Sequence, residues 1–309
     1  MKPSSEIDDV VVTRVAARQP ERARAFADEH GIADIENDYV ALCTSEEVDL
    51  VYNGLPPSAH ARWSIAALEA GKHVLCEKPF AMNGGEAQLM VDAAQRSGRV
   101  LIEAFHYRFH PLFDRVLKII ASGQIGAIQH IESHFHVPIK FRPDELRYDR
   151  ALGGGSMMDL GCYPLHWART VMGAEPEVLS AKAVWHESGV DIAMRAELEF
   201  PDGVRASISS AMSEQLPPSR DVILVVKGDS GELSVDNPVA PHNGHVLDVT
   251  TSAGHYTEEV AGGTTYFHQL QHVAAVLRGD AAAVTGGEDA VGNMRALDSI
   301  YWLAGAGNA

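Results

Sequence analysis

The stretch LGGGSMMDLGCYPLHW, residues 152 to 167, brings a glycine loop, a carboxylate and a phenol together at the start of one predicted helix. Its three successive glycines permit a close backbone approach that side chains would block. If the chain turns helical after them, Asp159, Tyr163 and His166 follow at spacings of four and three and project from one helix face. Such a polar face is ordinarily solvated, but the glycine run in front of it favours a functional site.

A second stretch, HVLCEKP at residues 73 to 79, supplies the partner that a phenol needs for proton exchange. A phenol has a pKa of about 10, and a nearby lysine lowers it towards neutrality. Here a short apolar strand leads straight into Glu77 and Lys78 and is stopped by Pro79. Charged groups at the carboxyl end of a buried strand lie where open α/β sheets bind ligands.

These motifs together resemble one family of oxidoreductases. The EKP tripeptide after a strand, followed by GGG and then D-x-x-x-Y, is similar to the glucose-fructose oxidoreductase, inositol dehydrogenase and rhizopine-catabolism (Gfo/Idh/MocA) family. The GCYP context and the segment EAFHYRFHP, residues 103 to 111, resemble most closely its dimeric dihydrodiol dehydrogenase and NADP-dependent D-xylose dehydrogenase branch. The resemblance runs from about residue 10 to the C-terminus.

The resemblance implies hydride transfer between nicotinamide and a sugar or cyclic trans-dihydrodiol. Tyr163 would exchange the hydroxyl proton, Lys78 would lower its pKa and bind the same oxygen, and Asp159 would orient the substrate or the lysine. The substrate-binding residues would be Lys78, Arg108, Asp159, Tyr163 and His166. The cofactor-binding residues would be Arg18, Leu55, Pro56, His60, Glu77 and Lys78.

Two of these assignments have open alternatives. Arg108 could lie near the substrate or form a structural ion pair. His166 could replace Tyr163 as the acid-base residue, although the spacing from Asp159 favours the tyrosine.

The expected cofactor is NADP, with NAD possible. Arg18 stands where the family's second strand ends, and an arginine there can pair with a 2′-phosphate, whereas an acidic residue would favour NAD. An ordinary solvated arginine before a helix is the alternative interpretation.

The sequence departs from the family at its start, because no G-x-G-x-x-G turn precedes the first predicted strand. In a 3-2-1-4-5-6 sheet the missing strand is the central one, and its glycine turn would hold the pyrophosphate. Either the given start lies downstream of the true one, or this is a natural variant with an impaired cofactor site. The presence of Lys78, Asp159 and Tyr163 favours the first. A non-catalytic ligand-binding or regulatory homologue is the rival hypothesis.

The predicted fold has two domains. Residues 1 to 104 alternate strands and helices, which is typical of a Rossmann-like doubly wound parallel sheet, here lacking its first strand. Residues 105 to 309 predict an α+β domain with a large, mainly antiparallel open sheet, because 196 to 200 and 204 to 208 alternate strictly between apolar and polar. Long strands are expected at 10 to 17 and 127 to 137, and helices at 111 to 121, 265 to 277 and 288 to 303.

Net charge and hydropathy limit the classes of partner that the chain can bind. The 309-residue chain has a net charge of -17, which repels nucleic acid and anionic membranes. It has neither an 18-residue apolar stretch nor a signal-peptide pattern. We therefore expect a cytoplasmic protein that binds a small molecule and forms a homo-oligomer, a dimer or larger, through its C-terminal sheet.

Metal binding is not expected from the sequence. The three cysteines lack CxxC spacing, and two histidine pairs stand out, His106 with His110 and His134 with His136. No cysteine or carboxylate completes a convincing ligand set for either pair, and Pro111 interrupts any helix through the first pair. The sequence alone therefore predicts no metal site.

Overall fold

The computed structural model describes residues 2 to 217 and 221 to 306, and these divide into two compact units. The first unit holds the residues up to Ala104 together with Tyr266–Val291; the second holds Phe105–Thr265 and the residues from Gly292 onward. The sequence predicts 266 to 291 in the second domain. They group with the first unit because Val273 of α7 (Thr265–Arg278) is buried against Leu75, Ile102 and Ala104.

The first unit contains two separate pieces of parallel sheet. Strands β1 (Arg14–Val15) and β2 (Asp34–Ile35) form one, and β3 (Leu50–Asn53), β4 (His73–Cys76) and β5 (Leu101–Glu103) form the other. In a Rossmann sheet with the strand order 3-2-1-4-5-6, the first piece corresponds to strands 3 and 2, and the second corresponds to strands 4, 5 and 6. The predicted parallel sheet is thus confirmed, and its break falls at the position of the central strand.

The first strand is much shorter than predicted. Residues 10 to 17 carry a β-branched run, but β1 includes only Arg14–Val15. Its partner β2 is equally short, and Val11 is 76% exposed. A β-branched run becomes a long buried strand only where neighbouring strands and helices cover it.

Helices of the first unit follow local signals. Helices α1 (Pro20–His30) and α3 (Pro57–Glu69) begin with proline at the first position, and α1 ends at Gly31 with φ +66°. Helix α4 (Gly84–Ser97) begins with a side-chain cap, in which Asn83 Oδ1 accepts from Glu86 N at 2.9 Å. A short helix, α2 (Tyr39–Thr44), and a 3-10 turn, η1 (Lys2–Glu6), complete this part.

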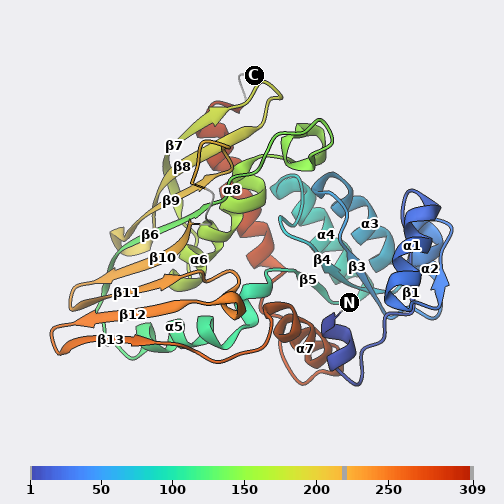
Figure 1. The fold of residues 1–309 in the computed structure, drawn as a ribbon, viewed down its shortest axis with the longest axis horizontal. Coiled ribbons are helices and arrows are strands. Elements are labelled where there is room, and N and C mark those ends of the chain that lie inside the picture. The colour runs from blue at the N-terminus through green and yellow to red at the C-terminus, as the bar shows by residue number, and fades with distance from the viewer. Residues whose placement is uncertain (1, 218–220, 307–309) are drawn as a thin grey trace. The chain divides into compact units, whose positions relative to one another are not determined.

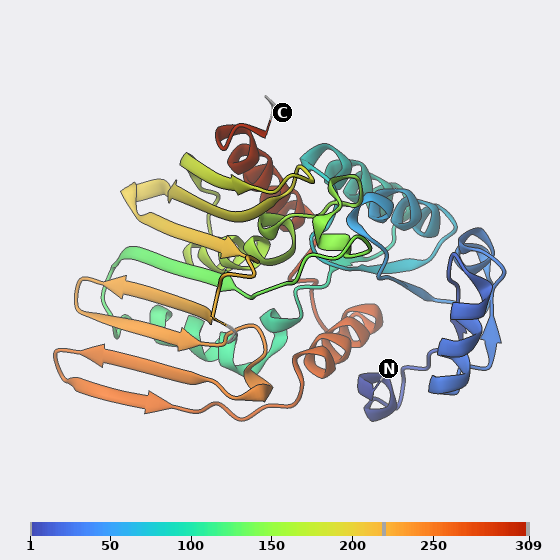
Figure 2. The same ribbon diagram turned by 45° about the horizontal axis from the view of Figure 1, so that its top comes forward.

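The second unit is built on an eight-stranded sheet. Figures 1 and 2 show how its strands lie side by side. Its order is β13-β12-β11-β10-β6-β9-β8-β7, and only β6 and β9 run parallel to each other. The predicted large, mainly antiparallel sheet is confirmed. The strands are β6 (Ile128–His136), β7 (Glu177–Trp185), β8 (Asp191–Glu199), β9 (Arg205–Ala211), β10 (Asp221–Gly228), β11 (Gly231–Asp236), β12 (Val246–Thr251) and β13 (Gly254–Glu258).

Helices cover one face of this sheet. Helices α5 (Pro111–Ala121) and α6 (Cys162–Met172) lie on the same side (Figures 1 and 2), and α8 spans Glu288–Leu303. Ile131, Ser133 and Phe135 of β6 are buried towards α6, where Ser133 donates to the Pro164 carbonyl at 3.3 Å. The alternation of side chains therefore directs His134 and His136 to the opposite face. Among the described residues, no helix combines the length and apolar character needed to cross a bilayer.

Candidate active site

The glycine run at residues 153 to 155 is required by close contacts within the protein itself. A Cβ on Gly154 would lie 2.6 Å from the Arg147 carbonyl oxygen. Gly155 has φ +125°, and a Cβ there would overlap Asp191 Oδ1. The close approach predicted from these glycines is thus made to the backbone of the preceding loop and to one buried carboxylate.

That carboxylate, Asp191 at the start of β8, anchors the turn into the following helix. It is 1% exposed and accepts three hydrogen bonds: from Ser156 Oγ at 2.7 Å, from Met157 N at 2.8 Å and from Tyr301 Oη of α8 at 2.7 Å. Burial raises the pKa of Asp191, and the three donors act in the opposite direction. The start of the site helix is therefore tied to both the sheet and the last helix.

The site helix is not a continuous α-helix, which corrects the basis of one prediction. Residues Met157–Gly161 form a π-helical segment, and regular α6 begins only at Cys162. The wider π turn changes the angular step between Asp159 and Tyr163, so the α-helical spacing rule applies only to Tyr163 and His166, whose rings both contact Phe105. The three side chains have different partners.

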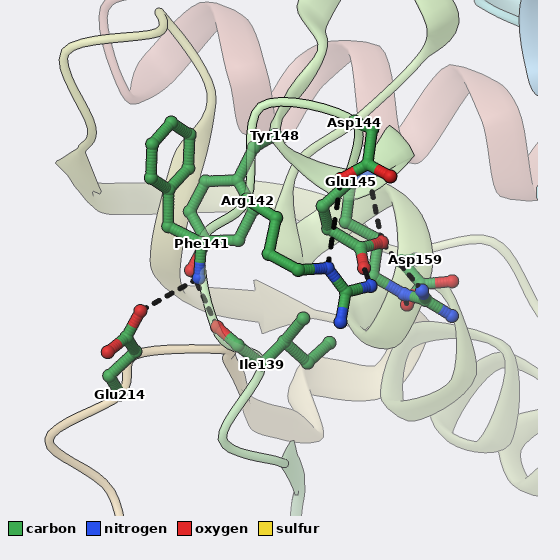
Figure 3. A network of polar contacts seen from close by, with 9 residues as sticks. Ile139, Phe141, Arg142, Asp144, Glu145, Tyr148, Asp159 and Glu214 are labelled. Atoms are coloured by element: carbon green, nitrogen blue, oxygen red, sulfur yellow. Dashed lines mark hydrogen bonds and ion pairs between the residues drawn. The ribbon is translucent and has the colours of Figure 1, made fainter.

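Asp159 is paired with an arginine that sequence reasoning did not single out. Arg147, in the 3-10 turn η3 (Leu146–Tyr148), donates through Nε to Asp159 Oδ2 at 2.5 Å and through Nη1 to Glu145 Oε1 at 2.9 Å. Burial lowers the pKa of Arg147, but the two carboxylates outweigh it and leave the pKa raised. Figure 3 shows this network, in which Arg142 also binds Glu145 at 2.9 Å. Arg147 therefore fixes the position of the Asp159 carboxylate.

Tyr163 lies in the buried part of the second unit, at 4% exposure, in a row of three polar side chains. Its Oη is 3.2 Å from His106 Nε2, and His106 Nδ1 is 2.8 Å from Thr265 Oγ1. A neutral imidazole donates at one nitrogen and accepts at the other, so this row can pass a proton in either direction. His106 is therefore a further candidate site residue, which the sequence singles out only as part of a histidine pair.

His166 and Arg108 have protein partners of their own. His166 is 1% exposed, its Nδ1 lies 2.6 Å from Tyr107 Oη, and its ring stacks on Phe105 at 4.1 Å. Arg108 Nη1 contacts Asp114 Oδ1 at 3.1 Å, so the ion pair left open by the sequence is formed. Their predicted substrate contacts remain predictions.

In the first unit, His60 joins two of the predicted cofactor segments. Its fully buried ring has Nδ1 at 3.0 Å from the Pro79 carbonyl oxygen and Nε2 at 2.6 Å from the Leu55 carbonyl oxygen. Burial lowers the pKa of His60, while both carbonyl contacts favour the protonated ring. The imidazole therefore fixes the loop at Leu55–Pro56 against the turn that follows β4.

That turn carries Glu77 and Lys78. Tyr52 Oη donates to Glu77 Oε1 at 2.6 Å, and Glu77 Oε2 accepts from the Lys78 backbone N at 3.2 Å. Lys78, which is partly exposed, precedes Pro79 through a cis peptide bond. Arg18 is exposed between β1 and α1, at the predicted strand end. The structure thus gathers Leu55, His60, Glu77 and Lys78 in the first unit, and Tyr163 and His166 in the second.

Comparison with known proteins identifies the family of this chain. A sequence model described as "Oxidoreductase family, NAD-binding Rossmann fold" matches residues 2–105, and one described as "GFO/IDH/MocA C-terminal domain" matches residues 113–234. D-xylose 1-dehydrogenase (NADP(+)) 2 of Haloferax volcanii is 33% identical over 99% of this chain and 94% of its own. The chain belongs to the Gfo/Idh/MocA oxidoreductase family.

Two further members of this family extend the comparison. Trans-1,2-dihydrobenzene-1,2-diol dehydrogenase of Xenopus tropicalis is 33% identical over 68% of this chain and 63% of its own. The crystal structure of KijD10, a 3-ketoreductase from Actinomadura kijaniata in complex with NADP and TDP-benzene, matches with a TM-score of 0.88 and 26% identity over 98% of this chain and 92% of that one. The predicted family membership is confirmed.

Proposed function

We propose that this chain is an NADP-dependent dehydrogenase acting on a sugar or a cyclic trans-dihydrodiol. The observation that carries the proposal is the buried Tyr163 phenol at 3.2 Å from the His106 imidazole, in a chain whose relatives include sugar and dihydrodiol dehydrogenases. A phenol held against an imidazole is a general acid-base group. The deciding experiment replaces Tyr163 with phenylalanine, which removes the phenol oxygen and keeps the ring.

Residues at three strand ends would contact parts of the cofactor. The loop Leu55–Pro56, after β3, and the Glu77–Lys78 pair, after β4, would hold the nicotinamide end, and Arg18, after β1, would pair with the 2′-phosphate. When bound, NADP would supply the hydride acceptor or donor. The fit is incomplete at the pyrophosphate, since the sequence holds no G-x-G-x-x-G turn.

The chain's own residues would handle the proton. Tyr163 would take up or release the proton of the substrate hydroxyl, and His106 would exchange it with the phenol and with Thr265. Lys78 would stabilise the phenolate by its positive charge. Asp159, held by Arg147 at 2.5 Å, would accept a hydrogen bond from a substrate hydroxyl.

The preference for NADP over NAD rests on one exposed side chain. Replacing Arg18 with alanine should weaken NADPH binding by about tenfold and leave NADH binding unchanged, because only NADPH carries the 2′-phosphate. Fluorescence titration with both nucleotides measures this difference. The matched control is Arg24→Ala, which removes another exposed arginine from α1 itself. Equal losses for both nucleotides would contradict a phosphate contact by Arg18.

The second candidate function is a ligand-binding or regulatory relative without a working cofactor site. The break between the β1–β2 and β3–β5 sheets favours it. The same titration separates the two candidates. Failure to bind either nucleotide, both by this chain and by one extended upstream to the preceding in-frame start, would remove the dehydrogenase proposal and favour the ligand-binding relative.

We also propose that the chain acts as a cytoplasmic homodimer through the uncovered face of its large sheet. That face carries charges of both signs in pairs, such as Lys227 with Glu132 at 2.8 Å and Arg205 with Glu199 at 3.0 Å. Such a face can meet its own copy without net repulsion. Light scattering during size-exclusion chromatography should give the mass of two chains; a single-chain mass would reject the dimer.

A further inference from the structure

On the face of the large sheet opposite α6, three potential metal ligands come together from two strands. His134 and His136 are two residues apart on β6, and Asp221 begins β10 directly opposite His136. One ligand atom from each lies within 4.8 Å of the other two. Two imidazoles and one carboxylate form a ligand set used for divalent transition metals.

The distances within this cluster suit a bound ion. His134 Nε2 lies 2.8 Å from Asp221 Oδ1, and His136 Nδ1 lies 3.8 Å from Asp221 Oδ2. Ligand atoms about 2.0 Å from a tetrahedral Zn²⁺ are separated from each other by about 3.3 Å. The two observed distances bracket that separation, so small side-chain rotations would complete the geometry.

A neighbouring serine orients the second histidine. Ser209 of β9 places its Oγ 3.0 Å from His136 Nε2. When His136 donates from Nε2 to this oxygen, its Nδ1 carries a lone pair on the side of Asp221. Histidine ligands commonly have such a partner on the ring nitrogen that does not bind the metal.

The simpler interpretation is an ordinary ion pair, but it accounts for only part of the cluster. His134 alone forms a hydrogen bond with Asp221. His136 Nδ1, at 3.8 Å, is too far for one, although its ring stacks on that of His134 at 4.5 Å between centroids. A cation between the three groups would engage both imidazoles and both carboxylate oxygens.

We propose that His134, His136 and Asp221 bind a divalent transition metal ion of the Zn²⁺ class, with water completing its coordination. In the single chain the three side chains are partly or largely exposed, so an ion can reach them from solvent before two copies meet at this face. The chain's net charge of -17 adds a general attraction for cations. This site is independent of the proposed dehydrogenase chemistry.

The test is calorimetric titration of Zn²⁺ into the full chain, made without a polyhistidine tag and stripped of metal with a chelator, at neutral pH. We expect one tight site per chain. His136→Ala and Asp221→Asn should each weaken it by about a hundredfold, and Ser209→Ala by about tenfold. The asparagine variant keeps the shape of the aspartate, and circular dichroism of each variant checks that it is folded.

A second histidine–aspartate pair provides the matched control. His255 Nε2 lies 3.2 Å from Asp248 Oδ1 on β13 and β12, but this pair is not part of any three-ligand cluster among the described residues. His255→Ala should leave the tight site intact. The proposal is overturned if the unaltered chain binds no Zn²⁺ tightly, or if His136→Ala binds it as well as His255→Ala does.

Discussion

Replacing Tyr163 with phenylalanine should lower kcat by about a hundredfold or more while the NADPH dissociation constant stays within about twofold. The phenol is the proposed proton carrier. Tyr163 is only 4% exposed, and its Oη lies 3.2 Å from His106 Nε2. The substitution removes one oxygen atom and keeps the ring. Initial rates with D-xylose and with a trans-dihydrodiol as NADP+-linked substrates, together with nucleotide titration, measure both quantities.

Tyr107→Phe is the matched control for this experiment. It also removes a buried hydroxyl from the same aromatic cluster, where Tyr107 Oη lies 2.6 Å from His166 Nδ1. We expect it to lower kcat by less than about tenfold, since this hydroxyl orients a neighbour and carries no substrate proton. An unchanged rate for Tyr163→Phe would remove the tyrosine from the mechanism, and a larger loss for Tyr107→Phe would point to His166.

Replacing Asp191 with alanine should lower the free energy of unfolding by about 3 kcal/mol or more. Asp191 is 1% exposed. Its removal leaves three donors, Ser156 Oγ, Met157 N and Tyr301 Oη, without their common acceptor. Urea denaturation followed by circular dichroism measures the change. Asp248→Ala, which removes a partly exposed aspartate from β12, should change stability by less than about 0.5 kcal/mol.

The pH dependence gives Asp191 a second test. Burial raises the pKa of Asp191 above its value of about 3.9 in the unfolded chain, so the native state binds this proton more tightly. The contribution of Asp191 to stability is therefore fully present below the unfolded pKa and declines as pH rises through the native pKa. Asp191→Asn cannot ionise and should lack this decline. Parallel pH profiles for the two proteins would contradict a raised pKa.

Much of the fold was predictable because its signals are local. The Asn83 cap, the proline at the start of α1 and the glycine at its end act within a few residues, and the helices form where these signals stand. The alternation at Ala196, Leu198 and Phe200 likewise predicted one buried sheet face. The family motifs around Lys78 and Tyr163 predicted the oxidoreductase family, which the sequence comparisons confirm.

The partners of each side chain depended on the tertiary structure. The pattern of residues 10 to 17 does not predict that, of these residues, Arg14–Val15 alone pair with a neighbouring strand. Likewise, no sequence motif predicts the π-helical segment at Met157–Gly161. His106 meets Tyr163 across 57 positions of the chain, and Asp221 meets His134 across 87. Short-range spacing describes one helix or strand at a time, whereas hydrogen bonds and ligand sets form between elements that only folding brings together.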